Sequence, residues 1–362
     1  MIAKLAAAAL MVVVSGAAQA QEWKAEWDAL VAKAKGQTFN AAVAPDGAFL
    51  GTLTAFGKKF GIEIQPTVAR PSQHLARIQT EQRNGQFVWD LWMGGTSNMV
   101  NTASPAGLLE PSMEKYFVLP EVKDPANWRH PDFIFNDSRR AVFAVTNKVE
   151  YYTFRNTTVL PEVKLATWDE FADPRLKGKI GMRDLSVPNA GAFSVATMLG
   201  AKGGDFVRKV LKEQDVKIFE NPQQLETSLV RGAVAVALGL ETSLWDKCRA
   251  DGGCKHVDRM DQFRAATSTG MSIPKNPPHP DVVKLWVNWF LSKEGQDVWV
   301  NTWAAGSPSG AVSMRKDVPP VKGHEDSLPD FTQAERYIFV SSERGSQEID
   351  ETIKIFKEVT GR

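Results

Sequence analysis

The sequence predicts an α/β protein with mostly parallel strands, organised in two domains. Short apolar segments alternate with amphipathic helical segments through the first hundred residues, which is the pattern of strand–helix–strand units. The same alternation returns after residue 178. At 362 residues the chain is longer than the roughly 250–300 residues that one hydrophobic core commonly organises, and this favours two domains.

The first half contains three predicted strands and two predicted helices, namely strands at 36–45, 62–68 and 87–95 and helices at 48–61 and 74–85. Apolar residues at a helical period, among them Phe49 and Leu53, support the first helix. Ser72 is expected to cap the second helix, which Gly85 ends.

Three loops follow the carboxyl ends of these strands. Open α/β sheets bind ligands at that edge, where loops meet helix N-termini. Free backbone N–H groups with a hydroxyl or a cation suit an anion or a polar small molecule. Each loop taken alone also fits an ordinary turn or cap. The candidate ligand-binding residues in these loops are Asp46, Arg70, Ser72, Gly95, Thr96 and Ser97.

The second half repeats this organisation. A long strand is predicted at 138–159 and another at 178–185, with a short helix docked by Trp168 and Phe171 between them. A loop and an apolar helix follow the second strand. The candidate ligand-binding residues here are Arg183, Asn189 and Gly191, with Glu241 further along the chain.

Two further helical patterns lie toward the C-terminus. Four Trp residues recur at helical intervals and are expected in the core, namely Trp286, Trp289, Trp299 and Trp303. Trp92 and Trp245 are instead expected beside the ligand-facing loops. Ile349, Ile353 and Phe356 predict an amphipathic C-terminal helix, whose domain the sequence leaves open.

The N-terminus resembles a secretory signal peptide. Lys4 precedes a ten-residue apolar run, and Ala18-Gln19-Ala20 is a small-residue cleavage site. The run is too short to span a bilayer, and a buried N-terminal helix is the alternative. Cleavage after Ala20 is expected to release the chain into the periplasm.

The balance of charges limits the classes of partner that the chain can bind. Loss of residues 1–20 removes one Lys and no acid, so the 43 basic residues become 42, against 42 acidic residues. Such a chain has no global field for nucleic acid or an anionic membrane surface. A monomer that binds a small molecule is expected, without a membrane span or a cofactor.

The two cysteines, Cys248 and Cys254, flank a Gly-Gly turn. In an oxidising compartment this favours a local disulfide. A metal site that includes His256 is the alternative, but it lacks a fourth ligand.

No motif indicates an enzyme. The chain contains no Gly-X-Ser-X-Gly, phosphate-binding or dinucleotide-binding motif, and its five histidines lack metal-ligand spacing. Such scattered histidines are expected on the surface or at helix caps. A pair of carboxylates that meet only in space stays open.

Several segments together resemble one family. "ATWDEFADPRLKGKIGMRD" is similar to the Trp-Asp-(Asp/Glu)-Leu-X-Asp-Pro-X-X-X-Gly-Lys-Ile pattern of extracellular solute-binding proteins, with Phe171 in place of the usual Leu. "FGKKFGIEI", "RIQTEQRNGQFVWDLWMGG", "TFRNTT" and "LWVNWFLSKEGQDVW" resemble further pieces in the same order. The similarity runs from about residue 36 to 320. These proteins are receptors of ABC importers, in the group of ferric-ion, thiamine, polyamine and phosphonate binders.

The resemblance implies a two-lobe periplasmic-binding-protein fold of type II, with a hinge and a ligand cleft between the lobes. The first lobe would comprise 21–140 and about 270–325, and the second 145–262, while 326–362 is left unassigned. Crossing strands are expected near 138–158 and 263–275. The partners would be a small solute and the inner-membrane permease, or a signalling partner if the protein is a sensor.

The ligand is less determined than the family. Ferric-ion members depend on tyrosinate ligands, and Tyr151 and Tyr152 offer an adjacent pair. However, adjacent side chains on a strand point to opposite faces. We therefore expect an anionic or zwitterionic organic solute, with Arg70 and Arg183 on its acidic group, Tyr151 facing it and Glu241 on an amine. A ferric-ion receptor is the alternative.

Overall fold

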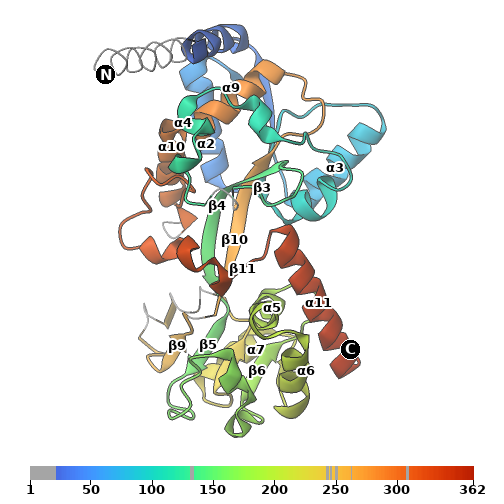
Figure 1. Cartoon of the computed structure of the whole chain (residues 1–362), viewed down its shortest axis with the longest axis vertical. Coiled ribbons are helices and arrows are strands. Elements are labelled where there is room, and N and C mark those ends of the chain that lie inside the picture. Colours follow the sequence, from blue (N-terminus) through green and yellow to red (C-terminus); the bar gives the residue numbers. More distant parts are fainter. Residues whose placement is uncertain are drawn as a thin grey trace, which may run out of the picture. The chain divides into compact units, whose positions relative to one another are not determined.

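The computed structural model describes residues 22–130, 134–241, 244, 247–248, 252–261, 263–306 and 310–362. The chain divides into two compact units (Figure 1). Unit 1 comprises residues up to Val145 together with Thr269–His324, and unit 2 comprises Thr146–Ser268 together with Glu325–Arg362. Both units combine strands and helices, so the predicted α/β class is confirmed.

Unit 1 is built around parallel strands. β1 (Thr38–Val43) pairs in parallel with both β2 (Glu63–Val68) and β3 (Leu91–Gly95). α2 (Gly47–Phe60) connects β1 to β2, and α3 (Pro71–Arg83) connects β2 to β3. The three strands and two helices predicted for this region are all present.

The start of α3 differs from the prediction. The helix begins at Pro71 with Arg70 in the cap position, so Ser72 lies inside the first turn and does not cap it. Pro71 starts the helix because its φ is already helical and its missing N–H would be unpaired there. The Gln73 side chain accepts a hydrogen bond from the Arg70 N–H, 3.0 Å away.

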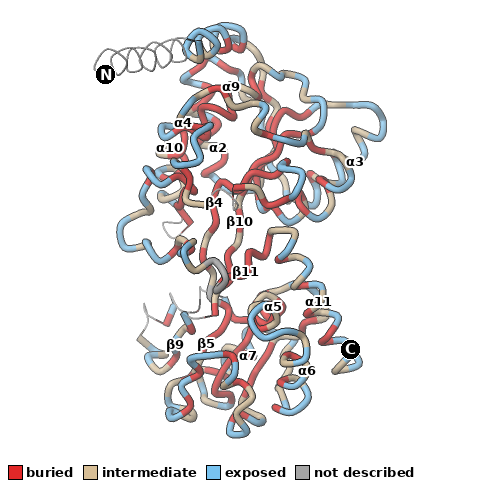
Figure 2. Tube along the Cα trace, viewed as in Figure 1, coloured by how far each residue is buried: buried red, intermediate tan, exposed pale blue. Residues whose placement is uncertain are grey.

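Unit 1 also contains a helix at residues 22–34, α4 (Pro120–Lys123), α9 (Pro280–Leu291), α10 (Lys293–Ala304) and short helical turns at Met99–Ala103, Met113–Tyr116 and Pro125–Asn127. Aromatic side chains of α2, α9 and α10 pack together in its core. Trp286 stacks on Phe290 with ring centroids 4.7 Å apart. Trp289 and Trp299 are also buried, as predicted, while Trp303 is half-buried beside Trp299. Figure 2 shows the buried residues concentrated along the strands and the inner sides of the helices.

Two long strands contain residues of both units. β4 covers Val142–Tyr151 and β10 covers Arg264–Ser272. The last residues of β10 pair antiparallel with β3 in unit 1, and its first residues pair with β11 (Tyr337–Phe339) in unit 2. The predicted strand at 138–159 is therefore interrupted at Tyr152, because β5 (Thr153–Asn156) pairs with different strands.

Unit 2 holds a five-stranded sheet in the order β7-β6-β8-β5-β9. β6 (Ile180–Arg183) is parallel to β7 (Lys217–Phe219) and to β8 (Val236–Leu238), whereas β5 is antiparallel to β8 and to β9 (Val257–Arg259). Its helices are α5 (Ala190–Lys202), α6 (Gly204–Glu213), α7 (Pro222–Val230) and α11 (Glu343–Thr360), with short turns at Trp168–Ala172, Pro174–Leu176, Glu325–Ser327 and Phe331–Arg336.

The predicted C-terminal helix is α11. It lies beside α5 and α6 in unit 2 (Figure 1). Ile349 and Phe356 are buried in the core of this unit, and Ile353 packs against the same core. The apolar face that the spacing predicted is the face that α11 buries.

Trp168 and Phe171 both belong to the short helical turn Trp168–Ala172, and their side chains are buried and anchor it. The Trp168 ring stacks on Phe263, with centroids 3.8 Å apart. The predicted disulfide is confirmed, since Cys248 and Cys254 are bonded with their Cα atoms 5.0 Å apart.

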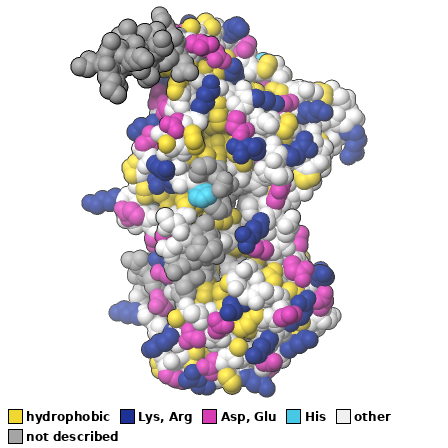
Figure 3. Space-filling view, in the orientation of Figure 1, with side chains coloured by type: hydrophobic (Ala, Val, Ile, Leu, Met, Phe, Trp, Pro, Cys, Tyr) yellow, Lys and Arg dark blue, Asp and Glu magenta, His cyan; other side chains and the backbone are white. Residues whose placement is uncertain are grey.

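Two features bear on partners. Among the described residues, no helix is long and apolar enough to cross a membrane. Lys and Arg side chains are interspersed with Asp and Glu on the face drawn in Figure 3. The predicted signal peptide, residues 1–20, lies outside the described residues.

Gly270 on β10 admits no side chain. A Cβ atom there would lie 2.4 Å from the carbonyl oxygen of Phe143 and 2.5 Å from Cγ2 of Thr96. We predict that Gly270→Ala lowers the free energy of unfolding by about 1–3 kcal/mol, because the added methyl group would push β4 and Thr96 away from β10. Thermal and urea unfolding measure this. Gly47→Ala is the control, since nothing lies within 4 Å of that site, and an equal loss in both variants would contradict the prediction.

Arg315 is fully buried and pairs with Asp317 at 2.8 Å and with Glu121 at 3.2 Å. Hydrogen bonding to Arg315 holds the pKa of the Asp317 carboxyl below its ordinary value. A lowered folded-state pKa stabilises the fold above the unfolded pKa, about 4, and this stabilisation is lost as the pH falls through the folded value.

We therefore predict that Asp317→Asn lowers the Tm at pH 7, and that the difference from wild type shrinks as the pH falls below about 4. Thermal unfolding across pH 3–7 measures this. Asp28→Asn is the control, because Asp28 belongs to an exposed pair with Lys24 worth about 0.5 kcal/mol or less. A difference that does not change with pH would contradict the prediction.

Candidate functional site

The three predicted loops of unit 1 meet at one edge of its sheet. The Ala44 N–H donates to the Met93 carbonyl at 3.1 Å, and the Ala69 N–H donates to the Val43 carbonyl at 3.1 Å. These bonds hold the carboxyl ends of β1, β2 and β3 at the same level. A Cβ atom on Gly94 would lie 3.3 Å from the Ala44 Cβ, so the first and third loops are in close contact.

The candidate residues at this edge differ in availability. Asp46 caps α2, and its carboxylate accepts the Ala48 N–H at 2.8 Å. Thr96 is fully buried, and its hydroxyl accepts a hydrogen bond from the Asn136 amide at 2.9 Å. Arg70, Gly95 and Ser97 are exposed. The polar groups of Asp46 and Thr96 are therefore already used inside the fold.

Trp92 does not lie beside these loops as a ligand-facing ring. It is fully buried in the core of unit 1, together with residues such as Ile78 and Met99. Strand β3 is covered on both faces, so its side chains alternate between two buried environments. Trp245 lies outside the described residues.

The candidate residues of unit 2 gather where β6 and β8 end. α5 begins at Ala190, and its first turn touches the residue that follows β8. A Cβ atom on Gly239 would lie 2.6 Å from the Gly191 Cα and 3.0 Å from the Arg183 Cγ. Gly239 also has a φ of 111°, which side chains disfavour. Arg183, Gly191 and Gly239 are thus brought into direct contact, and the sequence analysis had not selected Gly239.

Asn189 is the cap of α5. Its side-chain oxygen accepts the N–H groups of Gly191 at 2.7 Å and Ala192 at 3.3 Å. Its amide nitrogen donates to the Asp184 carbonyl at 2.7 Å. The predicted Asn189 and Gly191 polar groups are therefore engaged with each other. Within the described part of the chain, the Ala190 N–H at the same helix end makes no hydrogen bond.

Arg183 carries the available positive charge at this edge. It is half-buried, and its guanidinium forms no hydrogen bond or ion pair with the residues that the structure describes. The neighbouring Asp184 is occupied, because it pairs with Arg362 at 2.9 Å and accepts the Ser186 N–H at 2.8 Å. Burial would raise the pKa of Asp184, but these hydrogen bonds outweigh it and hold the pKa below its ordinary value.

Of the two adjacent tyrosines, the structure describes the side chain of Tyr152. Tyr152 is buried and packs against Phe193, with ring centroids 5.6 Å apart. Burial raises the pKa of the Tyr152 phenol well above its ordinary value, and the carboxylates of Glu150 and Glu241 raise it further. The side chain of Tyr151 lies outside what the structure describes.

Glu241 is exposed at the end of the segment that follows β8. Among the described residues, no three His, Cys, Asp or Glu side chains are grouped closely enough to hold a metal ion. The histidines are only partly as predicted. His279 takes the cap position of α9. His74 is instead buried, its Nε2 donates to the Val43 carbonyl at 3.0 Å, and burial lowers its pKa.

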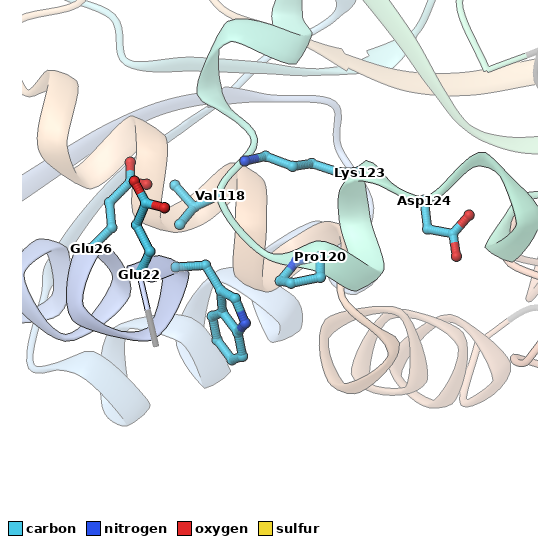
Figure 4. A pocket seen from close by; sticks show the side chains of 7 residues that line it. Glu22, Glu26, Val118, Pro120, Lys123 and Asp124 are labelled. Carbon is cyan, nitrogen blue, oxygen red and sulfur yellow. The ribbon is translucent and has the colours of Figure 1, made fainter. Parts of the chain in front are cut away.

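A separate cavity of about 520 Å³ lies on unit 1 and is lined by Glu22, Trp23, Glu26, Val118, Pro120, Lys123 and Asp124. In Figure 4 the Lys123 side chain extends toward the side of Glu22 and Glu26, while Asp124 points away. Glu26 is already paired with Lys284 at 2.7 Å. None of the predicted ligand-binding residues lines this cavity.

Parallel strand ends that meet helix N-termini are a general arrangement for holding a small solute. Residues 51–233 match the model of the bacterial extracellular solute-binding protein family. The match covers half of the chain. It includes β2, β3, β6 and α5, whereas β1 and β8 lie outside it. This chain therefore belongs to the bacterial extracellular solute-binding proteins, a family of binding components for transport.

Individual relatives are distant. An uncharacterised protein of Haemophilus influenzae is 24% identical over 262 residues, which cover 70% of this chain and 72% of that protein. The fold is similar to that of an ABC transporter protein from Clostridium perfringens, with a TM-score of 0.65, 15% identity, and 89% and 99% of the two chains covered. Iron-bound HitA from Pseudomonas aeruginosa has a TM-score of 0.55, 18% identity and the same coverage. These structures support the two-lobe periplasmic-binding-protein fold.

We predict that Gly239→Ala destabilises unit 2 and weakens solute binding, because the added Cβ would overlap the backbone of Gly191. Overpacking of this kind costs about 1–3 kcal/mol, and the displaced α5 would no longer face Arg183. Thermal unfolding and the retention of co-purified solute are the measurements. Gly253→Ala, at an exposed site with nothing within 4 Å, is the control. Unchanged stability of Gly239→Ala would contradict the close approach.

Proposed function

We propose that this protein is the periplasmic receptor of an ABC importer for a small anionic or zwitterionic organic solute. The chain would be exported by its signal peptide, cleaved after Ala20, and would act as a monomer. It would deliver the solute to the permease subunits in the inner membrane. The acidic group of the solute would be held at the unit 2 edge formed by Arg183 and the start of α5.

The Arg183 guanidinium, which has no partner among the residues that the structure describes, carries this proposal. A half-buried cation without a partner is costly unless a ligand completes it, and a guanidinium matches carboxylate and phosphonate groups with two parallel hydrogen bonds. The helix N-terminus beside it also favours negative charge. The positions of Arg70, Ser72, Gly95 and Ser97 at the unit 1 edge leave them as further candidates for polar contacts.

A ferric-ion receptor is the alternative, because one similar fold is that of iron-bound HitA. At 18% identity that similarity extends to the fold and not to the ligand. Fe(III) favours anionic oxygen ligands. The Tyr152 phenol is buried, and its raised pKa opposes the tyrosinate form. These observations support an organic solute over iron.

Native mass spectrometry of the mature protein purified from the periplasm tests the ligand class. We expect an organic adduct that is lost on denaturation. The denatured mass also reports where the signal peptide is cleaved. An adduct of iron mass, with visible tyrosinate absorption, would instead support the ferric-ion alternative and make Tyr151 the first residue to substitute.

We predict that Arg183→Gln weakens binding of the co-purified solute about 10- to 150-fold, because a hydrogen bond to a charged group contributes about 1.5–3 kcal/mol. Isothermal titration calorimetry on the solute-free protein measures this. Arg175→Gln is the matched control, since Arg175 is an exposed arginine of the same unit paired with Asp173. Equal affinity of the wild type and Arg183→Gln would overturn the assignment of the acidic group to this edge.

A further inference from the structure

The end of the unit 2 sheet places three residues side by side on three neighbouring strands. Met182 of β6 and Thr153 of β5 are both register partners of Leu238 in β8. Arg183, Gly239 and Tyr152 come next to these residues, and the Gly239 N–H donates to the Tyr152 carbonyl at 2.7 Å. Two strand spacings separate Arg183 from Tyr152, which is about 10 Å between their backbones.

The Tyr152 end of this row is aromatic and lies near a carboxylate, whereas the Arg183 end carries a positive charge. Tyr152 and the half-buried Phe193 form an aromatic pair, tilted by 56°. Glu241 lies two residues after Gly239, and its carboxylate forms no hydrogen bond or ion pair with the described residues. The Leu240 N–H also donates to the Tyr152 carbonyl at 3.2 Å, which places the backbone of the next residue, Glu241, close to Tyr152.

Other charges near the row are balanced internally. Glu150 pairs with Lys148 at 3.0 Å, and Asp184 pairs with Arg362 at 2.9 Å. Among the described residues of this row, the unpaired charges are thus one cation, Arg183, and one anion, Glu241. Gly239 between them has no side chain, and the Gly191 backbone at the start of α5 fills the space that a Cβ would take. No side chain of residue 239 therefore stands between the two charges.

We propose that the solute is a short zwitterion, whose acidic group binds Arg183 and whose ammonium group binds Glu241 beside the Tyr152–Phe193 pair. This inference rests on the proposed function and adds the second charge of the solute. Aromatic faces and carboxylates both attract ammonium groups. A purely anionic solute would face the Glu241 carboxylate, and a purely cationic one would face Arg183, so either would meet repulsion at one end.

The test compares solutes that differ only in charge. The probes are sets of three compounds on one carbon skeleton of three to six carbons: the ω-amino acid or ω-aminophosphonate, the matching acid without the amine, and the matching amine without the acid. Calorimetry and thermal shift with the solute-free mature protein report affinity. We expect at least one zwitterion to bind 10-fold or more tightly than its matched acid and its matched amine.

Substitutions assign the two charges. Glu241→Gln should weaken zwitterion binding about 10-fold and leave the matched acid unchanged or tighter, whereas Arg183→Gln should weaken both. Glu213→Gln, an exposed carboxylate of the same unit without a partner among the described residues, is the control and should change neither. The Tm of each solute-free variant checks folding.

The outcomes separate the two proposals. If Arg183→Gln weakens binding but the matched acid binds as tightly as the zwitterion, or Glu241→Gln has no effect, the zwitterion inference is wrong and the receptor proposal stands. If Arg183→Gln has no effect, or iron is the bound species, the receptor proposal for an organic solute fails as well. If no compound of any set binds at millimolar concentration, the zwitterion inference is wrong as well.

Discussion

The candidate site depends on the close contact of two glycines. Gly239 lets the backbone after β8 approach the first turn of α5 at Gly191, at a distance that no side chain would permit. This contact holds the helix N-terminus against the carboxyl ends of β6 and β8 and brings Arg183 beside it. Because backbone N–H groups and a guanidinium attract the same kind of ligand, this steric constraint supports the anion-binding edge that we propose.

Both candidate edges show that internal hydrogen bonds leave only some polar groups for a ligand. Asn189 and Asp46 cap helices, and Thr96 accepts a hydrogen bond from Asn136, so their polar atoms satisfy the fold. Asp184 is paired with Arg362, while its neighbour Arg183 is not paired within the described part of the chain. A charged residue points to a ligand only after these internal partners have been counted.

Burial has opposite consequences for two arginines of this chain. Arg315 is fully buried, but Asp317, Glu121 and the Leu291 carbonyl compensate its charge, so it stabilises unit 1. Arg183 is half-buried and lacks such partners among the described residues, and an acidic group of a ligand would compensate its charge. The difference separates a structural arginine from a candidate binding residue, although both have the same chemistry.

The sequence by itself determined the α/β class, most strands and helices, the disulfide and the family resemblance. These features depend on local periodicity, on turn residues such as Gly61, and on Cys248 and Cys254 within one short loop. Only the tertiary structure decided that Trp92 is a core residue and that Gly239 meets Gly191. Contacts between residues far apart in sequence, and the pairing of each charge, depend on packing that local patterns do not encode.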